Sequence, residues 1–89
     1  GNTQIIVMHT PGHSKGSVCY LVDNIIFSGD TLFEGSCGRT DFPDGSDIEI
    51  TASLKKLKDL SGDYEVYPGH GNKTKLSAER IFNPYMRNL

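Results

Sequence analysis

Three polar side chains share one setting in this sequence: each lies in or beside a glycine-containing turn that follows a run of strand-forming residues. They are His13 in Pro-Gly-His, Asp30 directly after a glycine, and His70 in Pro-Gly-His-Gly. Imidazole and carboxylate groups together are typical ligands of zinc and similar divalent metals. A neighbouring glycine permits a tight turn and a close backbone approach. These residue types make His13, Asp30 and His70 candidate metal ligands; the alternative for each is a solvated loop residue.

The elements that must position these side chains are predicted from periodicity and turn residues. Strand-like runs cover residues 3–9, 17–22, 25–28 and 64–67, and Asp23-Asn24 predicts a tight hairpin turn between the second and third. The glycine- and aspartate-rich segment 31–45 predicts a long loop, which in compact domains is usually functional or disordered.

Two helices are predicted in the second half of the chain. Ser46 and Glu49 match the S-x-x-E capping box, Gly62 is the expected C-terminal cap, and Thr74 is the expected N-cap of a last helix over residues 74–82. The tail, residues 85–89, is expected to add one more turn. The first helix should bury one apolar stripe, formed by Ile50, Leu54, Leu57 and Leu60.

This order of elements predicts an α/β layered fold with a mixed or antiparallel sheet, in one domain over residues 1–89. Strand ends in such folds face a common edge, where sites are usually built. We therefore expect His13, Asp30 and His70 to lie near one another.

Composition restricts the partners. The net charge is −2, and the basic residues form no continuous block, so no nucleic-acid partner is predicted. The longest apolar runs are too short to span a bilayer, so no membrane partner is predicted. Cys19 and Cys37 form no disulfide framework and are expected to be free thiols in a reducing cytoplasm. A ligand or nucleophile role for Cys37 is the weaker alternative, because no second cysteine lies at ligand spacing.

The longer motifs resemble one known family. Residues 9–17, His-Thr-Pro-Gly-His-Ser-Lys-Gly-Ser, resemble the T-P-G-H-x-x-G-S turn of the metallo-β-lactamase superfamily. Residues 28–33 resemble its G-D-x-L-F segment, and residues 68–71 resemble its final P-G-H-G turn. The motifs Gly-Arg-Thr-Asp at 38–41 and Asn-Pro-Tyr at 83–85 resemble the glyoxalase II-like (hydroxyacylglutathione hydrolase-like) branch.

The resemblance implies a role for each candidate residue. His13 would complete the ligand set of a first metal, Asp30 would bridge two metals and orient the attacking hydroxide, and His70 would bind the second metal. The ions would be two divalent metals, zinc first, with iron or manganese as alternatives. His9 has no metal role in the family pattern.

The sequence departs from the family at one motif. The signature H-x-H-x-D-H, which supplies two ligands to each metal, does not occur in it. The resemblance therefore implies the C-terminal half of an αββα sandwich, and the metals are expected only together with the missing N-terminal ligands. The alternative is a natural degenerate form that has lost its site.

The function implied for the full-length protein is metal-dependent hydrolysis of a small-molecule thioester or related ester, and the fragment alone is expected to be inactive. Lys15 and Tyr85 are candidates for substrate contact, whereas Arg39 and Asp41 are expected to pair and hold the long loop. The alternative function is a non-catalytic or degenerate module that associates with another chain, or with its own copy, through an exposed sheet face. A flavoprotein or nuclease branch of the superfamily is a third reading.

Overall fold

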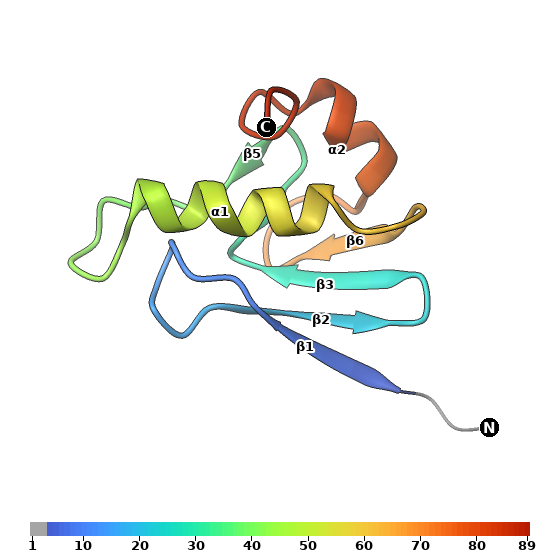
Figure 1. Ribbon diagram of the computed structural model, residues 1–89, viewed down its shortest axis with the longest axis horizontal. Helices are drawn as coiled ribbons and strands as arrows, with labels where there is room; N and C mark the ends of the chain where they lie inside the picture. The colour runs from blue at the N-terminus through green and yellow to red at the C-terminus, as the bar shows by residue number, and fades with distance from the viewer. Residues whose placement is uncertain (1–3) are drawn as a thin grey trace.

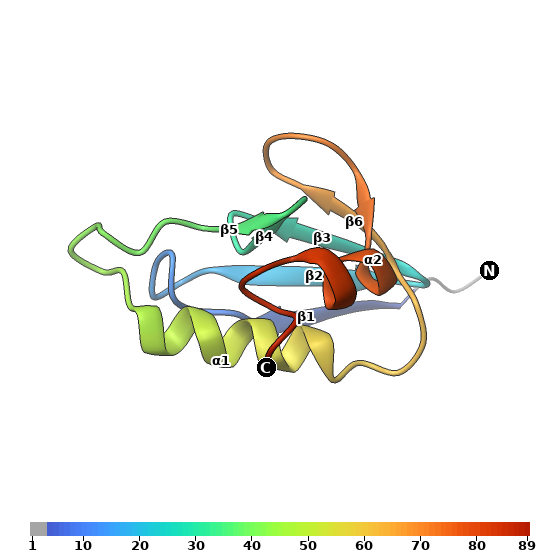
Figure 2. The ribbon, with the colours of Figure 1, turned by 90° about the horizontal axis from the view of Figure 1, so that it is seen from above.

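The structure, a computed structural model, describes residues 4–89. Its main element is a five-stranded sheet with the strand order β1-β2-β3-β6-β7, and two helices pack on one face of this sheet (Figures 1 and 2). A separate two-stranded hairpin, β4-β5, extends from the end of β3. The bounds are β1 Ile5–His9, β2 Val18–Val22, β3 Ile25–Gly29, β4 Leu32–Phe33, β5 Ser36–Cys37, α1 Asp47–Lys58, β6 Glu65–Pro68, β7 Thr74–Lys75 and α2 Leu76–Phe82.

The strand directions decide where the candidate site lies. β2 is antiparallel to both β1 and β3, so β1 and β3 run the same way, and β6 pairs parallel with β3. The C-terminal ends of β1, β3 and β6 therefore meet at one edge of the sheet. The predicted mixed α/β sheet is confirmed.

Local signals account for the β2–β3 hairpin and for the start of α1. Asp23 adopts a φ of 53° in the hairpin turn, a left-handed conformation that Asp tolerates better than most residues. Ser46 is the N-cap of α1, and its hydroxyl accepts a hydrogen bond from the Glu49 N–H at 3.1 Å. The hairpin turn and the helix start were both predicted correctly.

The ends of the helices differ from the prediction. α1 ends at Lys58 with Asp59 as its C-cap, so the prediction of Gly62 as the cap is wrong. The prediction of Thr74 as the N-cap of α2 is also wrong, because Thr74 belongs to β7 and pairs with β6. The first turn of α2 is instead satisfied by Asp63, whose carboxylate accepts the Ser77 N–H at 2.8 Å. This bond lowers the pKa of Asp63.

The segment predicted as one long loop contains the β4–β5 hairpin. Each of its strands has two residues, which is too short for an alternating pattern to be visible in the sequence. The hairpin is paired through Leu32 with Cys37 and Phe33 with Ser36. This correction matters for the site, because the hairpin begins two residues after Asp30.

The core lies between the sheet and the helices. The predicted stripe of α1 is buried at Ile50, Leu54 and Leu57, whereas Leu60 is only partly buried. The tail forms the predicted extra turn, and it buries Met86. The rest of the buried apolar cluster comes from the strands and from the start of α2: Cys19, Leu21, Ile26, Leu32, Val66 and Leu76. Neither helix within residues 4–89 is long and apolar enough to cross a membrane.

Two aliphatic residues on α1 provide a matched test of this packing. Leu54 is 1% exposed and Ile48 is 84% exposed. We expect Leu54→Ala to lower the free energy of unfolding by about 2–5 kcal/mol, because it leaves a cavity in the core. Ile48→Ala should change it by no more than about 0.5 kcal/mol. Urea unfolding of the two variants measures both values, and equal losses would contradict the described orientation of α1.

Candidate metal centre

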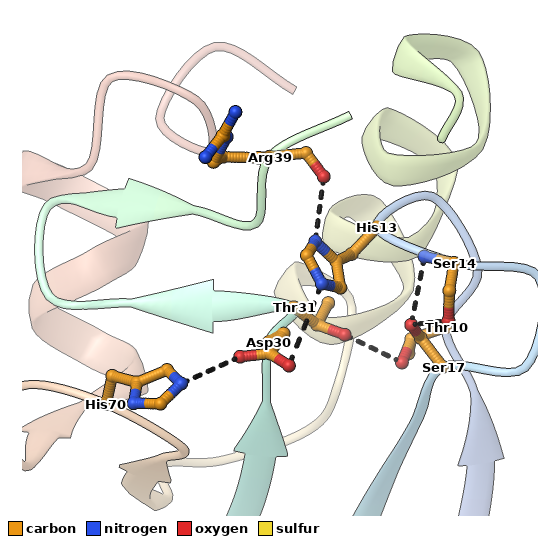
Figure 3. Close-up of polar contacts among 8 residues, drawn as sticks. All are labelled: Thr10, His13, Ser14, Ser17, Asp30, Thr31, Arg39 and His70. Carbon is orange, nitrogen blue, oxygen red and sulfur yellow. Dashed lines mark hydrogen bonds and ion pairs between the residues drawn. The ribbon is translucent and has the colours of Figure 1, made fainter. Parts of the chain in front are cut away.

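His13, Asp30 and His70 meet at the edge where β1, β3 and β6 end (Figure 3). The Nε2 atom of His13 lies 3.8 Å from Oδ2 of Asp30, and Nε2 of His70 lies 3.6 Å from Oδ1 of the same carboxylate. Asp30 thus faces one imidazole with each of its oxygens. The expectation that these three side chains lie together is confirmed.

The turn that carries His13 is held by helix α1. Gly12 has a φ of 141°, and a Cβ atom on it would lie 2.4 Å from the backbone of Ile50. The Gly12 carbonyl accepts the Ser46 N–H at 2.8 Å, and the Pro11 carbonyl accepts the Ser53 hydroxyl at 2.7 Å. Only glycine therefore fits at position 12, and the helix fixes the height of the turn above the sheet.

The orientation of the His13 ring is set by the chain after β5. Its Nδ1 atom lies 2.8 Å from the carbonyl oxygen of Arg39. A carbonyl only accepts, so Nδ1 carries the proton, and in the neutral ring Nε2 keeps a free lone pair directed toward Asp30. Metal-binding histidines commonly have such an outer partner, because it fixes both the tautomer and the ring orientation.

Asp30 is positioned by a close backbone approach. The Gly38 N–H donates to the Thr31 carbonyl at 3.1 Å, which brings the chain after β5 against the residue pair that follows β3. A Cβ atom on Gly38 would lie 1.9 Å from the carbonyl oxygen of Asp30. The position of Asp30 therefore depends on glycine at residue 38.

His70 is brought beside Asp30 by the parallel pairing of β6 with β3. The Gly69 N–H donates to the Gly29 carbonyl at 2.8 Å, which extends this pairing into the turn. The His70 side chain is 83% exposed, and its ring lies 6.5 Å from that of Phe33 between centroids. His70 is the most solvent-accessible of the three side chains, at the open side of the site.

The separations match those of atoms that share a metal ion. Two atoms bound to one tetrahedral zinc lie about 3.4 Å apart, because each bond is about 2.1 Å long. The observed 3.8 Å and 3.6 Å are close to this value and longer than ordinary hydrogen bonds. Within residues 4–89, however, no group of three or more His, Cys, Asp or Glu side chains is arranged to hold an ion. The donor set thus offers one imidazole nitrogen beside each oxygen of the Asp30 carboxylate, which is too few ligands to hold an ion without others.

The three side chains line a hollow of about 390 Å³ that has aromatic walls. The Phe42 ring meets the His13 ring edge-on, with centroids 5.5 Å apart, and the Phe33 ring lies beside His70. Phe33 and Phe42 were not among the predicted site residues. The final aromatic of the G-D-x-L-F segment was a signal for Phe33, whereas no local pattern marks Phe42.

The other predicted residues lie outside the trio. Arg39 and Asp41 form the expected pair, 2.7 Å apart, which raises the pKa of Arg39 and lowers that of Asp41. The His9 ring contacts the Lys15 carbonyl at 2.7 Å. Tyr85 lines a neighbouring hollow of about 510 Å³. Substrate contact by Lys15 or Tyr85 remains a prediction.

Both cysteines are free, as predicted. Cys37 lines the same hollow as the three candidate ligands. Burial raises the pKa of its thiol, and the nearby charge of Asp47 raises it further. Cys37 is therefore a neutral thiol at pH 7, which argues against its use as a nucleophile.

Similarity to known proteins identifies the family of this chain. The family model of the metallo-beta-lactamase superfamily matches residues 1–70. The chain belongs to this superfamily. An uncharacterized protein of Mycobacterium leprae is 45% identical to it and aligns with 100% of the chain and 43% of its own length. The hydroxyacylglutathione hydrolase GloC of Haemophilus influenzae is 36% identical over 90% of the chain and 39% of its own length.

Solved structures of the superfamily have the same fold. The crystal structure of TTHA1623 in a di-iron-bound form superposes with a TM-score of 0.87 and 43% identity, over 91% of this chain and 42% of that one. The chain thus spans about two fifths of the length of the relatives that it matches. The predicted superfamily, with a hydroxyacylglutathione hydrolase among the relatives, is confirmed.

The close approach at Gly38 gives a testable prediction. Gly38→Ala should lower the free energy of unfolding by about 3 kcal/mol, because the new methyl group overlaps the Asp30 carbonyl. Gly16→Ala is the control, since a Cβ atom there meets nothing within 4 Å. Thermal unfolding measures the stability, and the amide shifts of residues 30 and 31 report displacement. A neutral Gly38→Ala would refute the described packing.

Proposed function

We propose that His13, Asp30 and His70 are ligands of a dinuclear metal centre in the whole protein. His13 would hold one ion, His70 would hold the other, and the Asp30 carboxylate would serve both. The observation that carries this proposal is the carboxylate of Asp30, each oxygen of which faces a different imidazole at 3.6–3.8 Å. The hydrogen bond from His13 to the Arg39 carbonyl supports it, because it leaves Nε2 free to bind.

The remaining ligands come from sequence outside these 89 residues. The relatives are more than twice as long as the chain, which leaves room for a second set of ligands. Zinc is the proposed metal because imidazole and carboxylate suit it, and iron is the alternative, as in the di-iron form of TTHA1623. The 89-residue chain alone should bind metal weakly and catalyse no measurable hydrolysis.

The proposed reaction is hydrolysis of a thioester or related ester. Support comes from GloC, a hydroxyacylglutathione hydrolase that matches 90% of the chain. Two divalent ions supply a Lewis acid and lower the pKa of water towards about 7. Asp30 would orient the attacking water, and the site is open to solvent on the side of His70. The raised pKa of the Cys37 thiol argues against Cys37 as a competing nucleophile. Two free thiols suit a reducing, cytoplasmic location.

The bridging role of Asp30 can be tested in a protein extended upstream to the length of its relatives. We expect Asp30→Ala to lower thioester hydrolysis by at least about 100-fold and to lower the bound zinc, because both ions lose a shared ligand. Asp44→Ala is the control, since Asp44 is an exposed carboxylate on the loop before α1. Hydrolysis is followed by release of the thiol, and zinc by elemental analysis. Full activity and full zinc content in Asp30→Ala would refute the role.

A second function is favoured by the outer face of the sheet. Val7, Tyr20, Phe27 and Tyr67 are paired in register across β1, β2, β3 and β6, and so they form a row on the face opposite the helices. All four are exposed, from 36% to 59%. An apolar row of this kind favours association. In this alternative the chain is a non-catalytic module that pairs with a second copy through the row.

Self-association can be tested with two matched variants. Phe27→Thr removes the centre of the apolar row and keeps a strand-forming residue, so it should shift the chain toward monomer if the row is the contact. Ile81→Thr is the control, because Ile81 is 64% exposed on α2. Sedimentation velocity at several concentrations measures the shift. A wild-type chain that stays monomeric at every concentration would exclude this function.

A further inference from the structure

Glu79 on α2 is a buried carboxylate that the proposed chemistry does not use. It is 3% exposed, and its hydrogen bonds come from three neutral donors. Burial of a carboxylate is costly unless its oxygens are hydrogen-bonded. These donors come from three separate parts of the chain, so the arrangement is informative about what Glu79 holds together.

The first two donors lie on the two segments that flank the candidate site. The Gly35 N–H, at the tip of the β4–β5 hairpin, donates to Oε1 at 2.8 Å. The Thr74 hydroxyl, at the end of the loop that carries His70, donates to Oε2 at 2.8 Å. One carboxylate thus connects the segment that follows Asp30 with the segment that follows His70.

The third donor extends the connection along the hairpin. Asn83 is fully buried, and its two amide N–H groups are shared among three acceptors, which are Glu79 Oε1 at 2.9 Å, the Ser36 carbonyl at 3.0 Å and the Phe33 carbonyl at 3.3 Å. Phe33 belongs to β4 and Ser36 to β5, so both strands of the hairpin are attached to the C-terminal end of α2. A network with all its members satisfied rigidifies the groups it joins.

The hairpin and the His70 loop also meet directly at the site. The Phe33 ring lies 6.5 Å from the His70 ring, and the two side chains border both the hollow of about 390 Å³ and an adjoining one of about 380 Å³. The Asn72 amide contacts the Glu34 carboxylate at 3.5 Å, on the exposed side. The hydrogen bonds through Glu79 are shorter and less exposed than the Asn72–Glu34 contact. They are therefore the stronger polar connection between the hairpin and the His70 loop.

We propose that Glu79 is a positioning residue that sets the distance between the β4–β5 hairpin and the His70 loop, and thereby the place of His70 relative to Asp30. The effect of this positioning on metal binding rests on the proposed function, whereas the positioning itself does not. Glu79 acts through hydrogen-bond geometry, because its partners are neutral.

This proposal predicts different outcomes for two substitutions of Glu79. Glu79→Gln keeps the network, because the amide oxygen still accepts from Gly35 and Asn83, and the amide nitrogen donates to the Thr74 oxygen. Glu79→Ala removes the acceptor of the Gly35 N–H and of the Thr74 hydroxyl, whereas the Asn83 amide keeps the Ser36 and Phe33 carbonyls. A carboxylate with a purely electrostatic role would give the opposite result for Gln, which lacks the charge.

The first measurement uses the metal-free chain. Nuclear Overhauser contacts between the Phe33 and His70 rings report the distance that Glu79 sets, and those between the His13 and Phe42 rings report a part of the site that it does not touch. We expect Glu79→Ala to weaken the Phe33–His70 contact at least about twofold relative to the His13–Phe42 contact. Glu79→Gln should keep the wild-type ratio. Two results would overturn the proposal. One is an unchanged ratio in a folded Glu79→Ala chain, and the other is a ratio in Glu79→Gln that falls as it should in Glu79→Ala.

A second variant covers the case in which Glu79→Ala does not fold. Thr74→Val has the same shape and removes only the bond to Oε2. Thr51→Val is its control, because the Thr51 hydroxyl is exposed and donates within α1, to the Asp47 carbonyl at 2.8 Å. Thr74→Val should weaken the Phe33–His70 contact selectively and Thr51→Val should not. Equal effects of the two valine variants would overturn the proposal.

A third measurement uses Zn²⁺ alone as the probe of the same chain. If His70 is a ligand, Glu79→Ala should weaken the Zn²⁺-induced shift of the His70 resonances about tenfold in midpoint, and Glu79→Gln should stay within about threefold. Absence of any Zn²⁺ response at His70 in the wild-type chain would count against the proposed metal centre. The ring contacts would still decide the positioning role, so the two failures are distinguishable.

Discussion

The parallel pairing of β3 with β6 is the interaction on which the rest of this structure depends. β1, β2 and β3 are consecutive antiparallel neighbours, whereas β6 reaches β3 only after the hairpin and all of α1. Closing this connection costs conformational entropy. Burial of Ile26 and Val66, which are paired across the two strands under the helices, offsets that cost. The pairing continues from Gly29 to Gly69, and it places His70 beside Asp30.

Local sequence patterns were sufficient to find the three candidate ligands, because each follows a recognisable strand and lies beside glycine. They were also sufficient for the start of α1, where the Ser46 hydroxyl accepts the Glu49 N–H within one turn. They were not sufficient for the direction of β6. A short apolar run looks the same in a parallel and an antiparallel pair, and direction is decided by the helix between the strands. The proximity of His13, Asp30 and His70 was therefore expected from the general arrangement of strand ends in α/β folds, and no local pattern predicted it.

The features that sequence reasoning missed have their partners far away in the chain. Asp63 caps a helix that begins with Leu76, and no local motif joins the two. Glu79 reads as an ordinary charged position of a helix, yet its acceptors are filled by Gly35, Thr74 and Asn83. The β4–β5 hairpin, whose strands have two residues each, is hydrogen-bonded to Glu79 and Asn83. In physical terms, hydrogen-bond partners that are distant in the sequence replaced the local ones that the patterns assume.

The attachment of the Pro-Gly-His turn to α1 limits how this site can be moved between proteins. The turn touches the helix at the backbone of Ile50 and through hydrogen bonds from Ser46 and Ser53. A short loop with the sequence Pro-Gly-His would lack this support when grafted onto another sheet. The smallest transferable unit is therefore the turn together with the first two turns of α1, and a designer who copies His13 must copy that helix face with it.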